Sequence, residues 1–199
     1  MRALLALALL LGAAPAVAQP KRDIYACSAE VRSGPTRAIS TREIAPRGQL
    51  RETRTSFQTS FAGPPTVMMS AEWNTPGLPE VARGRYSFSV ARIDPAAEAA
   101  QLQLLIAGRP VAKSGWAAGR LQPVIEVRGR ELGAAWFAGT PVAIRLVARG
   151  GRLLSTTPIA REGVDRAIDL ARQANASVLA KATDFRRQCG PAAQVITAA

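Results

Sequence analysis

The C-terminal part of the chain holds the feature that most constrains the fold, an amphipathic helix expected over residues 162–187. Apolar and amide side chains recur there at spacings of three and four: Val164, Ile168, Ala171, Asn175, Val178, Ala182 and Phe185. The helix is expected to end before Gly190-Pro191, because Gly favours the left-handed conformation past a helix end and Pro cannot continue a helix. A helix with one apolar face is stable when that face packs on another element. The rest of the chain must therefore supply a surface for it.

The first residues, 1–18, have the features of a signal peptide. A positive charge at Arg2 precedes an apolar run, and the small residues Ala16-Val17-Ala18 follow it. This pattern predicts cleavage before Gln19 and a periplasmic or secreted mature protein. The apolar run is shorter than the roughly 20 residues of a transmembrane helix, and no later stretch reaches that length without a charge or a proline. We therefore expect no transmembrane segment.

The mature chain has the size of one ordinary domain. We expect a single β-rich domain over residues 19–190 and a loose tail over 191–199, where the residues are mostly small. Cys27 and Cys189 are its only cysteines, and the chain has no histidine. A cysteine pair in an exported chain favours a disulfide over zinc, which usually takes four ligands. Closing so long a loop contributes on the order of 5 kcal/mol in the chain-entropy model.

Most of the remaining sequence has the alternation of apolar and polar residues that is typical of strands. Strands are expected near residues 23–32, 36–44, 50–61, 67–73, 86–90, 102–107, 124–128, 142–149 and 152–159. Residues 94–107 stay ambiguous, because Asp94-Pro95 is a good helix start while Leu102, Leu104 and Ile106 alternate. Residues 131–137 have the composition of a short helix. The predicted fold class is α+β: a mostly antiparallel β-sheet or sandwich of about eight strands, with the long C-terminal helix packed on it.

The last third of the chain combines a short helix, two strands joined by a glycine turn, and a glycine that opens the final helix. The segments are 131–139, 142–147, Gly150-Gly151, 153–159 and 163–167. This order resembles the invasion-associated locus B type of periplasmic protein. The chain departs from that family in having Val164 where the family tends to have an aromatic residue, in its longer final helix and in having only two cysteines. The resemblance implies a β-rich envelope protein with no assigned chemistry, and it identifies no functional residue.

The chain is strongly basic, with a formal net charge of +12 from 26 basic and 14 acidic residues. Removal of Arg2 with the signal peptide leaves 25 basic residues and a charge of +11. Such a charge attracts anions, which outside the cytosol are lipid phosphates, acidic polysaccharides and lipopolysaccharide, so no nucleic-acid partner is expected. Because 23 of the 26 basic residues are Arg, a GC-rich coding sequence explains the charge better than a dedicated anion-binding surface does.

The best-defined basic cluster is Arg145, Arg149 and Arg152, which are possible anion-binding residues. A two-residue turn at Gly150-Gly151 would place Arg149 opposite Arg152, with Arg145 further along the same face. Like charges directly opposite each other are destabilising, so this face should be solvated or meet an anion. A second candidate cluster is Arg83, Arg85 and Arg92.

The absence of histidine excludes His-based catalytic triads and most zinc, copper and haem ligation. Asp165 and Asp169 lie one turn apart on the helix, among Arg161, Arg166 and Arg172, and are expected to form ion pairs on a solvated face. No catalytic, cofactor-binding or metal-binding residue is therefore predicted, and no cofactor is expected.

Two further residue types have structural roles in this interpretation. Asn175 falls in the apolar stripe of the helix, so its amide should hydrogen-bond the backbone of a strand. Trp73, Trp116 and Trp136 are expected in the core or at its edge.

These observations favour a non-enzymatic exported protein, a binding or envelope-accessory protein whose partner is another envelope protein. The alternative is an anion-binding module for lipopolysaccharide or acidic lipid, followed by an enzyme of unfamiliar type. The sequence leaves the specific ligand and the oligomeric state open.

Overall fold

The computed structural model describes residues 24–63, 66–74, 77, 79–90, 99–115, 123–148 and 150–191. Several predictions from the sequence fall outside these residues: the signal peptide, the helix start at Asp94-Pro95, Arg92, Trp116, Arg149 and the tail beyond residue 191.

The described residues form eleven strands, three helices and one 3₁₀ turn. In chain order these are β1 (Tyr25–Ser33), β2 (Thr36–Ile44), β3 (Leu50–Phe61), β4 (Val67–Trp73), the 3₁₀ turn η1 (Val81–Arg83), β5 (Arg85–Val90), β6 (Ala99–Ile106), β7 (Arg109–Gly115), β8 (Ile125–Arg128), α1 (Gly129–Phe137), β9 (Val142–Ala148), β10 (Leu153–Pro158), α2 (Arg161–Ala182), α3 (Phe185–Gln188) and β11 (Gly190–Pro191).

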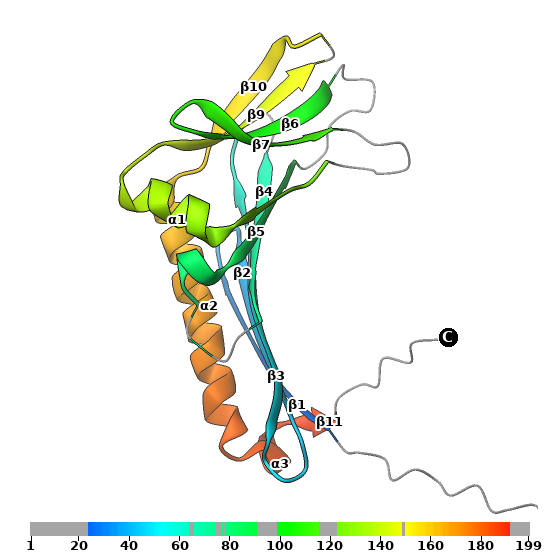
Figure 1. Cartoon of the computed structure of the whole chain (residues 1–199). Coiled ribbons are helices and arrows are strands. Elements are labelled where there is room, and N and C mark those ends of the chain that lie inside the picture. Colours follow the sequence, from blue (N-terminus) through cyan, green and yellow to red (C-terminus); the bar gives the residue numbers. More distant parts are fainter. Residues whose placement is uncertain are drawn as a thin grey trace, which may run out of the picture.

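The strands form two antiparallel sheets (Figure 1). The larger has the order β11-β1-β2-β3-β4-β5-β8, and the smaller has the order β10-β9-β6-β7. This confirms the predicted α+β class with a C-terminal helix on a mostly antiparallel sheet. The ambiguous stretch before Ala107 is a strand from Ala99 onward, and β7 adds a strand that the sequence indicated only as a turn towards Val111.

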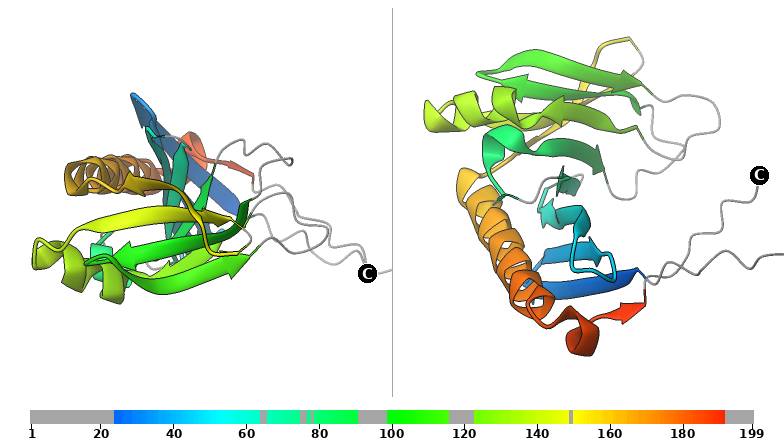
Figure 2. Two further views of the ribbon diagram at one scale, coloured as in Figure 1. Left: turned by 90° about the horizontal axis from the view of Figure 1, so that it is seen from above. Right: turned by 60° about the horizontal axis from the view of Figure 1, so that its bottom comes forward.

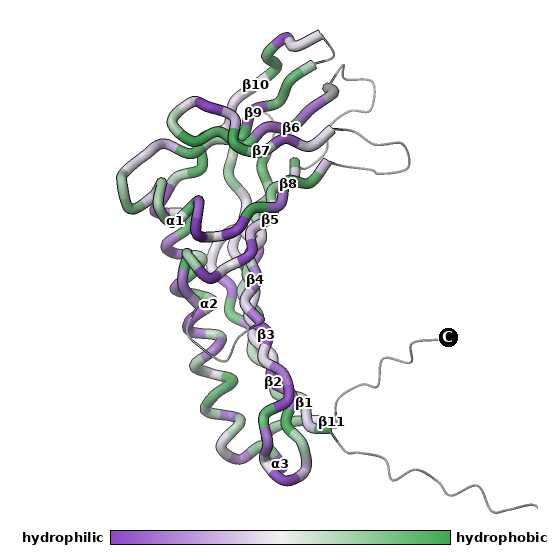
Figure 3. The backbone as a smooth tube through the Cα atoms, in the orientation of Figure 1, coloured by the Kyte–Doolittle hydropathy of each residue, from purple (hydrophilic) through white to green (hydrophobic). Residues whose placement is uncertain are grey.

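One face of the seven-stranded sheet is buried, as the alternation in its strands predicts. A row of directly paired residues shows this: Ala38, Phe57, Ala71, Tyr86 and Val127 face the same side, and each is at most 8% exposed. Helix α2 covers this face over β1, β2 and β3, while α1 and the four-stranded sheet cover its other end (Figure 2). Figure 3 shows the alternation of hydrophilic and hydrophobic segments along α2 that this packing requires.

Aromatic rings hold the centre of the core. Phe57 and Trp73 have centroids 5.8 Å apart, and Tyr86 lies 6.1 Å from both Trp73 and Trp136. The buried positions of Trp73 and Trp136 confirm the prediction for these two residues. Burial also raises the pKa of the Tyr86 hydroxyl well above its ordinary value.

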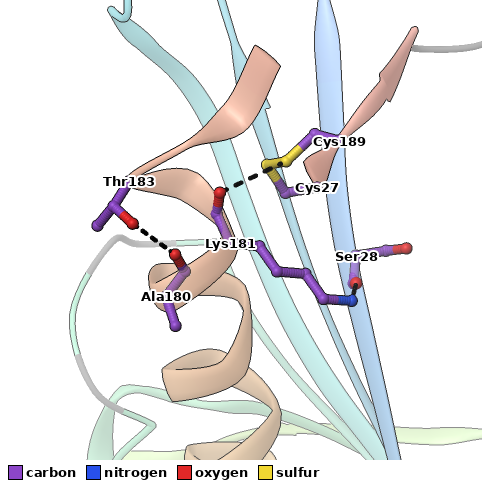
Figure 4. Close-up of a disulfide and its surroundings, with 6 residues drawn as sticks. All are labelled: Cys27, Ser28, Ala180, Lys181, Thr183 and Cys189. Carbon is purple, nitrogen blue, oxygen red and sulfur yellow. Dashed lines mark hydrogen bonds between the residues drawn. A yellow bond between two sulfur atoms is a disulfide. The ribbon is translucent and has the colours of Figure 1, made fainter. Parts of the chain in front are cut away.

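The predicted disulfide between Cys27 and Cys189 is present, with the two Cα atoms 4.6 Å apart. It joins β1 to the segment that follows α3, and Figure 4 shows the bond next to the end of α2. Beside it, the Lys181 ammonium donates a hydrogen bond to the carbonyl oxygen of Ser28, at 2.7 Å. The helix is thus attached to β1 by a covalent bond and a charged hydrogen bond.

The prediction of one helix over residues 162–187 is wrong beyond Ala182. Asp184 leaves the helical conformation with φ −125° and ψ 55°, and the Thr183 hydroxyl donates to the Ala180 carbonyl oxygen at 2.7 Å. The chain then makes the single turn of α3 before it reaches Cys189. A straight continuation would carry Cys189 away from Cys27, so the bond to β1 requires this break.

Asn175 does not make the predicted hydrogen bonds. Its side chain is buried, at 1% exposure, yet neither its nitrogen nor its oxygen has a hydrogen-bond partner among the described residues. The central strands β2 and β3 beneath α2 direct their backbone groups to neighbouring strands, so they offer no free carbonyl to this amide.

Candidate functional site

Two residues of the basic cluster predicted on the β9–β10 hairpin, Arg145 and Arg152, are among the described residues. The Ala148 nitrogen donates to the Arg152 carbonyl oxygen at 2.8 Å, and Gly150 and Gly151 both have φ of 87°. Arg152 therefore lies level with Ala148, whereas Arg145 pairs with Thr156. The predicted two-residue turn is wrong, because Arg152 pairs with Ala148. The prediction for Arg149 itself lies outside the described residues.

Arg145 and Arg152 also differ in their surroundings. Arg145 is half-buried and its Nε has no hydrogen-bond partner in the described part of the chain, while Arg152 is exposed near the hairpin tip. By strand alternation, Arg145 lies on the same face of the hairpin as Val147. Arg152 pairs with Ala148 and lies on the opposite face. The hairpin therefore does not bring these two arginines together.

The second predicted cluster, which includes Arg83 and Arg85, contains two further arginines in the structure. Arg83 and Arg85 line a hollow of about 390 Å³ together with Arg128 and Arg130. We call this hollow the arginine cleft; its other lining residues are Glu72, Asn74, Ala82 and Gly84. Sequence reasoning missed Arg128 and Arg130 because β5 pairs with β8, a strand far from it in the sequence.

Tight packing of α1 against η1 positions the arginine cleft. The Gly129 nitrogen donates to the Gly84 oxygen at 2.8 Å, and a Cβ at Gly129 would come within 1.8 Å of the Val81 carbonyl oxygen. Only glycine fits this close approach. The start of α1, and with it Arg128 and Arg130, is therefore held against the turn that carries Arg83 and Arg85.

On the other side of η1 lies a groove of about 480 Å³ between η1, α1 and α2, which we call the α1–α2 groove. Its apolar lining residues are Val81, Ala82, Trp136, Phe137 and Ile168. Phe137, at the C-terminal end of α1, is 78% exposed, the largest value among the exposed large hydrophobic side chains of the described residues.

Two arginines of α2 are fixed along this groove. Arg161 donates to Asp165 Oδ2 at 3.3 Å and to the Trp136 carbonyl oxygen at 3.0 Å. Arg172 donates to Asp169 Oδ1 at 2.9 Å and to the carbonyl oxygen of Pro79, which precedes η1, at 3.1 Å. These contacts tie α2 to α1 and to the segment before η1, so the groove is largely preformed.

The same contacts bear on the predicted ion pairs of α2. Asp165 and Asp169 each pair with one arginine, Arg161 and Arg172 respectively, and Arg166 makes no ion pair with another described residue. Glu80, the third carboxylate of the groove, pairs with Arg83. Each carboxylate in the groove is thus neutralised by an arginine.

The described residues contain neither a set of grouped metal ligands nor a helix that could span a membrane. No group of three or more Cys, Asp or Glu side chains there is arranged to hold a metal ion. No helix in the described ranges is long and apolar enough to cross a membrane.

Comparison with known proteins gives no match. No family model, no curated protein and no solved structure matches it. The resemblance of its last third to the invasion-associated locus B type therefore stays a prediction.

Proposed function

We propose that the chain is an exported, non-enzymatic protein that acts by binding another protein of the cell envelope through the α1–α2 groove. The observation that carries the proposal is Phe137, an aromatic side chain 78% exposed on the edge of a preformed groove. Aromatic side chains next to a hollow are typical anchors of protein interfaces, since they bury a large apolar area at a small cost in side-chain entropy.

The chemistry of the groove supports a polypeptide as the ligand. Apolar residues form part of its lining, and the ion-paired side chains of Arg161 and Arg172 border it. Apolar centres with a polar border are the usual composition of protein interfaces. The predicted signal peptide over residues 1–18 and the Cys27–Cys189 bridge support a location outside the cytosol.

Site-specific photo-crosslinking in cells that produce the exported protein tests this proposal. A photoreactive amino acid at position 137 should give a discrete adduct with one envelope protein. The control position is Val111, which is 49% exposed on β7 and lies outside the groove. Phe137→Ala should abolish crosslinking from a second groove position, Ala82, without changing the melting temperature. Equal adducts from positions 137 and 111, or no adduct from either, would refute the proposal.

A further inference from the structure

Two arginines of the arginine cleft lie directly opposite each other. Arg85 on β5 pairs with Arg128 on β8, and both side chains are exposed on the outer face of the seven-stranded sheet. Like charges at directly opposed positions destabilise a sheet. The local pairing therefore has an electrostatic cost that something else must offset.

The same sheet contains a second opposed arginine pair in which that cost is offset internally. Arg32 on β1 pairs with Arg37 on β2, and the Glu30 carboxylate binds both. Arg37 Nη2 donates to Glu30 Oε2 at 2.8 Å, and Arg32 Nε donates to the other carboxylate oxygen. These two guanidinium groups lower the pKa of Glu30, Arg37 being the larger cause.

The arginine cleft has no equivalent of Glu30 in the described part of the chain. Arg85, Arg128 and Arg130 form no ion pair there. Glu72 of β4 lines the cleft and lies opposite Arg85, but its carboxylate binds Arg54 Nε at 3.1 Å. Three cationic groups thus converge on one hollow with no carboxylate bound to them.

Helix α1 adds to this imbalance. Arg128 is its N-cap residue and Arg130 is its second residue. The N-terminus of a helix carries a partial positive charge, so cations are unfavourable there and anions are favourable. An anion in the cleft would reduce both this repulsion and the repulsion between Arg85 and Arg128.

We propose that the arginine cleft is a binding site for a phosphate group, which takes the place that Glu30 has between Arg32 and Arg37. Phosphate fits better than a single carboxylate, because its oxygens accept paired hydrogen bonds from several planar guanidinium groups at once. The phosphate belongs either to a free ligand or to a lipid headgroup. This site is independent of the proposed protein-binding groove, so either proposal can fail without the other.

The first experiment measures pyrophosphate binding by calorimetry to the wild-type protein and two double variants. Arg85→Gln with Arg128→Gln removes the opposed pair in the cleft. Arg32→Gln with Arg37→Gln is the matched control, because it removes an opposed pair and the same charge elsewhere on the sheet. We expect the dissociation constant to rise at least about tenfold in the cleft variant, since charge-assisted hydrogen bonds are lost, and to stay within about twofold in the control.

Unchanged binding in the cleft variant would overturn the proposal. An equal loss in both double variants would also overturn it, because that would show a general effect of net charge. The cleft variant should melt no lower than the wild type, since its substitutions relieve repulsion. If it nevertheless unfolds, Arg85→Lys with Arg128→Lys keeps the charge and removes the planar fork. Weaker pyrophosphate binding is expected for that variant as well, and undiminished binding would count against the site.

Vesicles distinguish the two sources of phosphate. Phosphatidylcholine vesicles with and without phosphatidic acid are tested for sedimentation with each protein, in the presence and absence of pyrophosphate. Binding to phosphatidic acid that pyrophosphate displaces, and that the cleft variant lacks, assigns the site to a lipid headgroup. Pyrophosphate binding without vesicle binding assigns it to a free phosphorylated ligand. Binding to neither probe refutes the proposal.

Discussion

The two ends of helix α2 pack on very different surfaces. Its first turns, from Val164 to Ala174, belong to a large apolar core that also includes the buried side chains of both sheets and α1. Its last turns contact a small cluster whose buried members are Cys27, Ile44 and Val178. We call these the main core and the distal cluster.

A polar layer separates the two along the strands. Between Ala38 of the main core and Ile44 of the distal cluster, the buried residues of β2 are Ser40 and Arg42. Their directly paired partners on β3 are Thr55 and Thr53, and the hydroxyls of Ser40 and Thr55 lie 2.9 Å apart. Burial lowers the pKa of Arg42, as expected for a cation held away from water.

Helix α2 presents Asn175 at the same level. This residue lies between Ala174, which belongs to the main core, and Val178, which belongs to the distal cluster. The comparison shows that one helix can be stabilised by two means. Apolar burial stabilises its first half, whereas the Cys27–Cys189 bond and the Lys181 hydrogen bond attach a second half that buries little apolar surface.

The largest effect is expected in the main core. Trp73→Ala removes a side chain that is 2% exposed and whose indole Nε1 donates to the Glu80 carbonyl oxygen at 2.8 Å. The free energy of unfolding should fall by about 3–5 kcal/mol in urea denaturation. Phe137→Ala, at an exposed position, should change it by less than about 0.5 kcal/mol and serves as the control. Similar losses in the two variants would contradict the assignment of the core.

Removal of the disulfide tests the distal end. Cys27→Ser with Cys189→Ser should lower the free energy of unfolding by about 2–5 kcal/mol. Hydrogen exchange should show the loss of protection first in α3, β11 and the last turn of α2, while β4 and β5 stay protected. Uniform loss of protection across both regions would mean that the two ends form a single cooperative unit.

Substitutions at Asn175 test how the polar layer affects stability. Asn175→Leu replaces a buried amide without hydrogen-bond partners by an apolar side chain of similar branching, so the free energy of unfolding should rise by about 1 kcal/mol. Asn175→Ala is the control for the packing of the side chain. A decrease in the Leu variant would show that the amide has solvent partners in this interface.

The smallest effect is expected at Glu30, on the outer face of the strand that carries Cys27. Because its pKa is below the ordinary value of 4.5, folding favours its carboxylate form. The stabilisation is complete above that ordinary value, and it is lost as the pH falls through the lowered pKa of the folded state. Glu30→Gln should therefore reduce the melting temperature slightly at neutral pH, and the difference from the wild type should vanish in acid. A difference that persists in acid would contradict the ionic origin of the effect.

Much of the local structure could be predicted because it depends on neighbouring residues. The bounds of β2, β3 and β4, the burial of alternate residues along them and the start of α2 follow from periodicity and turn residues. The disulfide was predictable because the chain contains only two cysteines. Less of the candidate site could be predicted: Arg83 and Arg85 were named, but the exposed position of Phe137 beside a groove has no signature in the sequence.

By itself, then, the sequence determined the class of fold, the strand faces and the covalent link, since each depends on residue types and their spacing. Only the tertiary structure decided that β5 pairs with β8, and so that Arg85 faces Arg128. It also decided that α2 stops at Ala182 so that Cys189 can reach Cys27, and that Arg152 pairs with Ala148 in the β9–β10 hairpin. The physical reason is the same in each case. Strand order, helix length and turn register are set by the free energy of packing distant segments together, which local periodicity does not contain.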